Sequence, residues 1–80
     1  MINVLFFAGL AEKTGQREIQ LEHIAGSTVE QLKEKLMQEY PQAKAEMSQA
    51  MIAVNEEYAE KTDTLQERDT VAFIPPVSGG

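Results

Sequence analysis

The stretch STVEQLKEKLMQEYP, residues 27–41, gives the clearest helix signal in the chain. Its apolar residues recur at the three- and four-residue spacing that gathers side chains on one helix face: Val29, Leu32 and Leu36. Ser27 and Glu30 fit the capping box that begins a helix, and Pro41 ends it. An apolar stripe of this kind must pack on another element, so the flanking sequence has to supply a second layer.

Strands are predicted on both sides of this helix. Residues 2–8, INVLFFA, and residues 70–74, TVAFI, are rich in β-branched and aromatic side chains, which is typical of strands. Residues 17–24 alternate apolar and polar side chains like a half-exposed strand, and residues 10–16 around Gly15 predict a loop. We expect the first two strands to form a hairpin.

The remaining segments complete an α+β pattern. Residues 51–59 predict a strand that turns near Asn55, and residues 42–50 fit a short helical turn on Ala43 and Met47. The order of elements is strand, strand, helix, strand, short element, strand. This order resembles the β-grasp, or ubiquitin-like, fold, in which a mixed sheet carries one principal helix on one face.

Length and charge limit the classes of function. The chain has 80 residues, which is room for one domain, and we divide it into a β-grasp domain at residues 1–74 and an extended tail at residues 75–80. Thirteen acidic and seven basic residues give a net charge of −6, which repels nucleic-acid phosphates and anionic membrane surfaces. We therefore expect protein partners and no nucleic acid. The sequence also has no apolar run long enough to cross a membrane and no signal-like start, so we expect no membrane association and a cytoplasmic location.

The ionisable side chains give no candidate for catalysis or metal binding. The chain has no cysteine, which excludes disulfides and thiolate ligands. His23 is the only histidine, and we expect it to be a solvated side chain at a strand end. The carboxylates show no spacing that isolates a catalytic pair. We expect no metal site and no catalytic site within this chain.

Apolar side chains also point away from the predicted helix. Alternation along the first and the last predicted strands sends Leu5, Phe7 and Ile74 to the face opposite the one that the helix covers. Two interpretations remain. Either loops and residues 42–50 cover this second face, or it is an exposed apolar patch for a partner protein, which is the interpretation we favour.

The sequence closes with FIPPVSGG, residues 73–80. Pro75 and Pro76 end the pairing of the last strand and stiffen an extended segment. The residues beyond them are expected to project from the domain: Val77, Ser78, Gly79 and Gly80. Extended, residues 75–80 reach roughly 20 Å, enough to enter another protein's active site. Glycines have no Cβ and fit a narrow channel, so the main-chain carboxylate of Gly80 is the predicted reactive group, and an inert tail is the alternative.

The whole chain resembles the ubiquitin-like sulfur carriers, and within them the MoaD-type small subunits of molybdopterin synthase. The resemblance rests on the opening INVLFFA, the helix STVEQLKEKL, the strand IAVNEEYA and above all the closing DTVAFIPPVSGG. A final pair of glycines alone would be weak evidence, but this closing stretch on a chain of this size is specific.

The resemblance implies a two-stage mechanism. An E1-like activating enzyme would use ATP and magnesium to convert the Gly80 carboxylate to an adenylate, and a sulfur donor enzyme would convert the adenylate to a thiocarboxylate. The tail, Pro75 to Gly80, would then enter the large subunit of the synthase, implied to be a heterotetramer, and pass sulfur to cyclic pyranopterin monophosphate. The carrier itself binds no cofactor stably, and the large subunit supplies the catalytic residues.

The resemblance also implies which residues meet the partners, and this sequence departs from the family pattern at four positions. Phe7, Tyr58 and Ile74 would form the patch that docks the large subunit and, in turn, the activating enzyme. An aliphatic residue is common at Tyr58 and a larger one at Ile74. A basic residue is often found where Ala11 stands. The turn before the last strand commonly has glycine where Arg68 stands, so either Arg68 has a strained positive φ or the turn here differs.

Other functions remain open at this point. The same adenylation chemistry would serve a sulfur carrier for another pathway, such as thiazole synthesis, or a ubiquitin-like modifier that forms isopeptide bonds with lysines. A β-grasp interaction module with an inert tail is the alternative from a different class. Removal of Gly80 separates the carriers from the module, because only the carriers need it.

Overall fold

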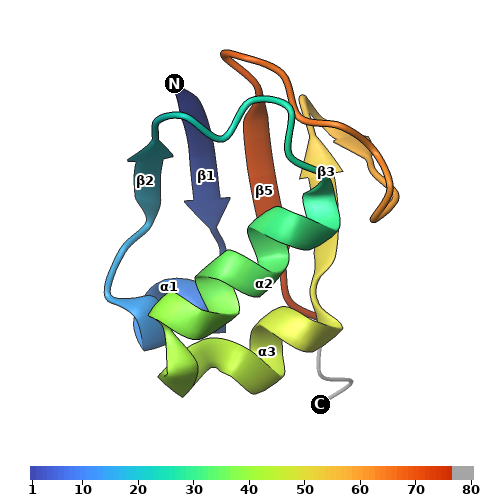
Figure 1. Ribbon diagram of the computed structural model, residues 1–80. Helices are drawn as coiled ribbons and strands as arrows, with labels where there is room; N and C mark the ends of the chain where they lie inside the picture. The colour runs from blue at the N-terminus through green and yellow to red at the C-terminus, as the bar shows by residue number, and fades with distance from the viewer. Residues whose placement is uncertain (77–80) are drawn as a thin grey trace.

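The computed structural model describes residues 1–76, and these form one mixed sheet with helices against it (Figure 1). The strands are β1 (Ile2–Phe6), β2 (Glu18–Leu21), β3 (Met51–Val54), β4 (Glu57–Tyr58) and β5 (Thr70–Ile74), and their order in the sheet is β2-β1-β5-β3-β4. β1 and β5 pair in parallel, and the other neighbours pair antiparallel. This is the β-grasp arrangement that the sequence predicts.

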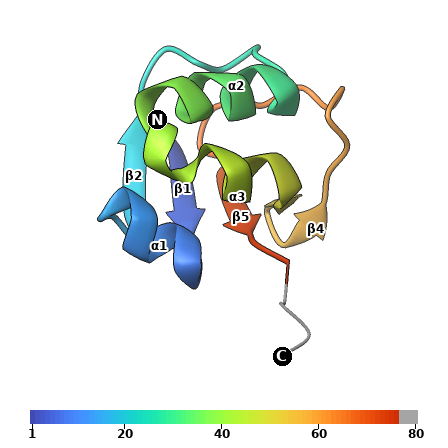
Figure 2. The same ribbon diagram turned by 90° about the horizontal axis from the view of Figure 1, so that it is seen from below.

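The helices gather on one side and at one end of the sheet. Helix α2 (Val29–Glu39) runs diagonally across the face, while α1 (Gly9–Thr14), the 3₁₀ turn η1 (Pro41–Ala43) and α3 (Lys44–Gln49) lie near the end where β1 finishes (Figures 1 and 2). The predicted turn over residues 42–50 is confirmed, and both Ala43 and Met47 are fully buried in the core.

The core lies between α2 and the facing side of the sheet. Helix α2 contributes the predicted stripe, and the strands contribute alternate residues: Val29, Leu32, Leu36, Ile2, Val4, Phe6, Val71 and Phe73. None of these side chains is more than 3% exposed. Burial of one such side chain contributes about 1.5–3 kcal/mol, so this layer carries most of the stability of the fold.

The prediction of a loop over residues 10–16 is wrong, because residues 9–14 form α1. Six residues are too few for a helix to be stable alone or to show a clear period. The helix forms because Leu10 is fully buried against the core and the hydroxyl of Thr14 donates to the carbonyl of Leu10 at 2.8 Å. Gly15 then ends it with φ 74°, a left-handed conformation that suits glycine.

The predicted capping box of α2 is displaced by one residue. Thr28, not Ser27, is the N-cap, and its hydroxyl accepts from the amide of Gln31 at 3.2 Å while the Gln31 side chain accepts from the Thr28 amide at 2.9 Å. Ser27 with Glu30 and Thr28 with Gln31 both match the sequence pattern of a capping box. The choice is made by a distant segment, since the Ser27 carbonyl accepts from the amide of Leu65 at 2.7 Å.

Two turns lie at one end of the sheet, one between β3 and β4 and one before β5, and hydrogen bonds join them. The predicted turn at Asn55 is a tight hairpin in which Asn55 and Glu56 have φ of 52° and 70°. The Asn55 side chain donates to the Asp69 carboxylate at 2.9 Å and accepts from the Thr70 amide at 3.0 Å. Arg68 has the positive φ predicted for its position, 73°.

Candidate functional site

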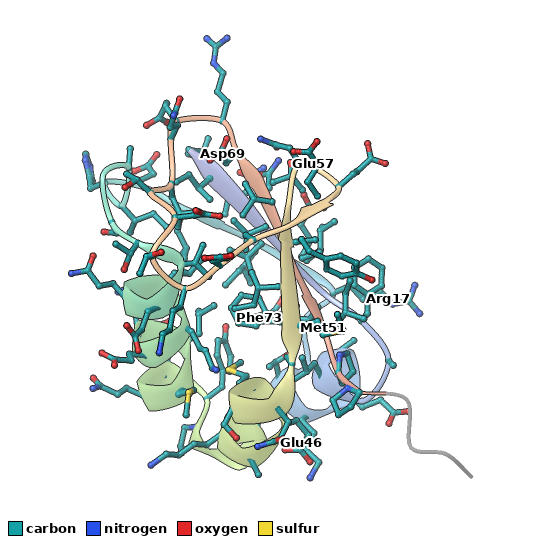
Figure 3. The ribbon with its side chains drawn as sticks, turned by 90° about the vertical axis from the view of Figure 1, so that its right-hand side faces the viewer. Arg17, Glu46, Met51, Glu57, Asp69 and Phe73 are labelled. Atoms are coloured by element: carbon teal, nitrogen blue, oxygen red, sulfur yellow. The ribbon has the colours of Figure 1, made fainter. Side chains whose placement is uncertain are left out.

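The side of the sheet away from α2 is uncovered by the described residues 1–76, and we call it the open face. Figure 3 shows α2 on one side of the sheet and Arg17 projecting on the other. Both η1 and α3 pack on the α2 side, because Ala43 and Met47 belong to the same core as Leu36. The interpretation in which residues 42–50 cover the second face is therefore wrong.

The strand register assembles the open face in two rows. In the first row Leu5 lies opposite Ala72, Ala72 opposite Ala53, and Ala53 opposite Tyr58, so the row crosses four strands from β1 to β4: Leu5, Ala72, Ala53 and Tyr58. In the second row Met51 lies opposite Ile74. Phe7 follows Phe6, whose partner is Phe73, so Phe7 continues this row beside Ile74. Residues directly opposite each other share a face of the sheet.

Apart from Met51, the residues of these rows line a shallow, mainly apolar hollow of about 660 Å³, to which Asn55, Glu56 and Thr70 add polar groups. Its walls include the residues that sequence alternation and resemblance predicted, with further apolar neighbours: Leu5, Phe7, Ala53, Tyr58, Ala72 and Ile74. Phe7 is 46% exposed and Tyr58 73% exposed. The structure thus brings Phe7, Tyr58 and Ile74 together on the face that alternation predicted, where Phe7 is exposed and Ile74 half-buried. Use of this face by a partner protein stays a prediction.

Sequence reasoning missed three members of this surface. Met51, Ala53 and Ala72 also point to the open face, and Met51 is 49% exposed. The signal for Ala72 was the same alternation that identified Ile74. For Met51 and Ala53 the signal was weak, because residues 51–54 are all apolar and alternation of apolar and polar side chains therefore does not distinguish the two faces.

The chain leaves the sheet at the edge of this surface. Because β1 and β5 are parallel, they end side by side, and the amide of Phe7 donates to the carbonyl of Phe73 at 3.3 Å. Pro75 is half-buried and Pro76 is exposed. The predicted tail residues Val77, Ser78, Gly79 and Gly80 lie outside the described residues. The apolar hollow and the start of the tail segment are therefore adjacent.

A strained turn follows Phe7. Ala8 has φ 52° and ψ −127°, and the Leu10 amide donates to the Phe7 carbonyl at 3.1 Å, which closes a tight turn of the type that normally has glycine at this place. Such a conformation costs an L-residue about 1–3 kcal/mol. The turn directs the chain from the sheet into α1 directly after Phe7.

A second hollow, of about 740 Å³, lies on the other side of Phe7. It is lined by Ala11, Glu12, Arg17 and Glu18 together with Leu5 and Phe7. The position where relatives are expected to have a basic residue, Ala11, therefore shares this hollow with Arg17. Phe7 separates an apolar hollow from a charged one.

One ion pair with a shifted pKa lies away from these hollows. Lys13 donates to Glu46 at 2.9 Å, and this hydrogen bond lowers the pKa of the Glu46 carboxyl. Residues 1–76 contain no group of three or more metal-binding side chains. Within the same residues, no helix has the length and apolar character to cross a membrane.

Comparison with known proteins gives one family. The ThiS family model matches residues 4–80. A relative from Arabidopsis thaliana, the molybdopterin synthase sulfur carrier subunit, is 38% identical over 99% of this chain and 82% of its own length. The crystal structure of SAMP1 from Haloferax volcanii superimposes with a TM-score of 0.85 at 25% identity, over 99% of this chain and 98% of that one. The protein–protein complex of subunits 1 and 2 of the molybdopterin-converting factor from Helicobacter pylori contains a similar fold, with a TM-score of 0.71 and 21% identity over 99% of this chain and 97% of that one.

Proposed function

Because the chain belongs to the ThiS family, we propose that it is the sulfur carrier subunit of a molybdopterin synthase. The relative from Arabidopsis thaliana has this function by name and aligns over nearly the whole chain. The structural observation that carries the proposal is the apolar hollow on the open face, which adjoins the point where residues 75–80 leave the sheet. A carrier of this class needs both a docking surface and a presented C-terminus.

The docking surface consists of Phe7, Tyr58 and Ile74. Two of these side chains expose large apolar areas that a monomer gains nothing by exposing, and burial against a partner removes that area from water. The large subunit of the synthase is the proposed partner, as in the complex of two subunits from Helicobacter pylori. An E1-like activating enzyme would use the same surface at a different stage, so the two partners compete for it.

The chemistry belongs to the Gly80 carboxylate. Its oxygen attacks the α-phosphorus of ATP at the activating enzyme, with magnesium, and pyrophosphate leaves. A sulfur donor enzyme then supplies the sulfur that replaces AMP on the carbonyl carbon, which gives the thiocarboxylate. Pro75 and Pro76 hold the segment extended, and Val77, Ser78 and Gly79 carry the sulfur into the large subunit, where cyclic pyranopterin monophosphate accepts it.

This division of labour assigns catalysis to the partners. The carrier contributes no catalytic side chain and holds neither ATP nor magnesium itself, and we propose that it works in the cytoplasm as part of a heterotetramer. The acidic surface, with a net charge of −6, suits partners whose docking sites are basic at the rim.

Intact mass measurement tests the proposal directly. The chain is incubated with ATP, magnesium, the activating enzyme of the same host and a sulfur source, and we expect a mass increase equal to replacement of one oxygen by sulfur at Gly80. A variant without Gly79 and Gly80 is expected to stay folded, show no mass change and transfer no sulfur to the pterin. Sulfur transfer by that variant, or an unchanged mass with an active enzyme, would overturn the proposal.

A second candidate function is that of a protein modifier. SAMP1 from Haloferax volcanii, described as small archaeal modifier protein 1, has the same fold. Both functions begin with adenylation, so the mass experiment does not separate them. Incubation of the activated chain with the large subunit and with a host lysate does: pterin sulfuration supports the carrier, and isopeptide products at lysines support the modifier.

A further inference from the structure

Met51 is an exposed methionine on the open face that neither the predicted docking residues nor the hollow of 660 Å³ includes. Its side chain is 49% exposed, and it lies directly opposite Ile74 at the start of β3. Ile74 is the last residue of β5 before Pro75. Met51 is thus one strand away from the point where the tail segment leaves the sheet.

The surface around Met51 is continuous with the proposed docking surface. Tyr58 lines the hollow of 660 Å³ and also a smaller groove of about 240 Å³ between β3 and α2, which Met51 lines as well, together with Glu30 and Lys33 of α2. The second row of the open face runs from Phe7 through Ile74 to Met51. A partner that covers Ile74 and Tyr58 therefore also covers Met51.

The four methionines of the chain differ in accessibility and position. Met47 is fully buried in the core, and Met37 is half-buried beside it. Met1 is 50% exposed, but it lies at the opposite end of β1 from Phe7, where its amino group pairs with Glu67. Met51 alone among them is both exposed and in contact with the docking surface.

We infer that Met51 belongs to the docking surface and that its oxidation to the sulfoxide by a peroxide switches docking off. This inference rests on the proposed function, because it names a regulation of the same surface. The chain has no cysteine, so a thiol cannot serve as the oxidised group. Thioethers are the remaining oxidisable sulfur in this chain.

The oxidation is a two-electron step. A lone pair of the Met51 sulfur attacks one oxygen of hydrogen peroxide, the O–O bond breaks, and the sulfur keeps that oxygen while the other leaves as water. The product is a polar, chiral sulfoxide in place of a flexible apolar side chain. Burial of that polar S–O group in an apolar interface without a hydrogen-bond donor is unfavourable, so affinity for the partner falls. Methionine sulfoxide reductases reverse the change.

The test uses the full chain and the large subunit of the synthase. The chain is treated with hydrogen peroxide, the peroxide is removed with catalase, oxidation is mapped by peptide mass, and binding is measured by calorimetry. We expect Met51 to oxidise much faster than Met47 and the oxidised chain to bind about tenfold or more weakly. Reduction by a methionine sulfoxide reductase should restore binding.

Met51→Leu is the matched control, because leucine keeps the apolar volume and cannot be oxidised. Each chain is compared with itself before treatment: Met51→Leu, whatever its starting affinity, should bind equally well before and after the same peroxide treatment, although its other methionines still oxidise. Unchanged binding of a wild-type chain with Met51 sulfoxide would overturn the inference, and so would an equal loss in peroxide-treated Met51→Leu. If the untreated chain fails to bind the large subunit, the proposed function itself is wrong, and the docking surface with it.

Discussion

The two faces of the sheet are built from the same strands and are similarly apolar, yet they end in opposite states. On the α2 side, Val4, Val71 and Phe73 are fully buried. On the open face, Phe7, Met51 and Tyr58 are 46%, 49% and 73% exposed. Neighbours in sequence separate onto the two faces, since Phe6 is buried and Phe7 is exposed.

Apolar alternation therefore has two uses in one small domain. The covered face contributes to the free energy of unfolding, because its area leaves water when the chain folds. The open face keeps its area in water when the chain folds, so under the proposed function it contributes to affinity for the partner instead. Substitutions on the two faces should therefore separate stability from binding.

The largest expected effect is on the covered face. Phe73→Ala removes a buried ring that lies 5.9 Å from the ring of Phe6, measured between centroids, and should lower the free energy of unfolding by about 3–5 kcal/mol. That is a large part of the roughly 5–15 kcal/mol typical of a domain. Urea denaturation measures the change. A loss below 1 kcal/mol would mean that the α2 side does not carry the stability.

A smaller effect, of a different kind, is expected on the open face. Phe7→Glu should leave the urea midpoint nearly unchanged, because the side chain is half-exposed in the folded chain. Binding to the large subunit should weaken by about 2 kcal/mol, roughly 30-fold, because a charge would be buried in the interface. Gln20→Glu adds the same charge on β2, opposite Asn3 and away from Phe7, and serves as the control. Equal affinities of wild type and Phe7→Glu for the large subunit would contradict the assignment of binding to the open face.

A substitution at Ala8, in the turn between β1 and α1, should stabilise the folded chain. Ala8→Gly relieves the positive φ at a cost in chain entropy, and the net gain should be about 1 kcal/mol. Ala11→Gly, three residues later within α1, is the matched control and should lose about the same amount. Thermal unfolding of the two variants measures this contrast. Destabilisation by Ala8→Gly would show that Ala8 is not strained.

The smallest effect concerns pH and lies in the helices at the end of the sheet. The hydrogen bond from Lys13 lowers the pKa of Glu46 in the folded chain below its ordinary 4.5. The ion pair therefore contributes fully above pH 4.5, and its contribution disappears as the pH falls through the lowered pKa. Because the pair is exposed, the contribution is small. Comparison of wild type with Glu46→Gln in urea at pH 6 and pH 3 checks it: the difference should shrink at pH 3.

Local patterns predicted most of the fold, and distant contacts explain the rest. Alternation and helical spacing identified the strands and α2 because each pattern repeats over several residues. Helix α1 was not predicted, because six residues are too few to show a helical period of apolar residues and its stability depends on the burial of Leu10. The exact cap of α2 depends on Leu65, 38 residues beyond Ser27, whose contact no local pattern contains.

The candidate site was predictable in part. Alternation placed Leu5, Phe7 and Ile74 on one face, and the register confirmed it. Alternation could not say that this face stays uncovered, because that depends on which side of the sheet residues 42–50 pack. Tyr58 came only from resemblance, and Met51 was missed because every residue of β3 is apolar.

The central position of β5 also has a mechanical consequence. β5 has a hydrogen-bonded neighbour on each side, parallel β1 and antiparallel β3. A force applied to Pro76 along the strand loads both ladders in shear, so many hydrogen bonds must break together. An edge strand pulled sideways would instead open one bond at a time. An enzyme that draws this end of the chain into a channel would therefore pull on a strand that is hydrogen-bonded along both of its edges.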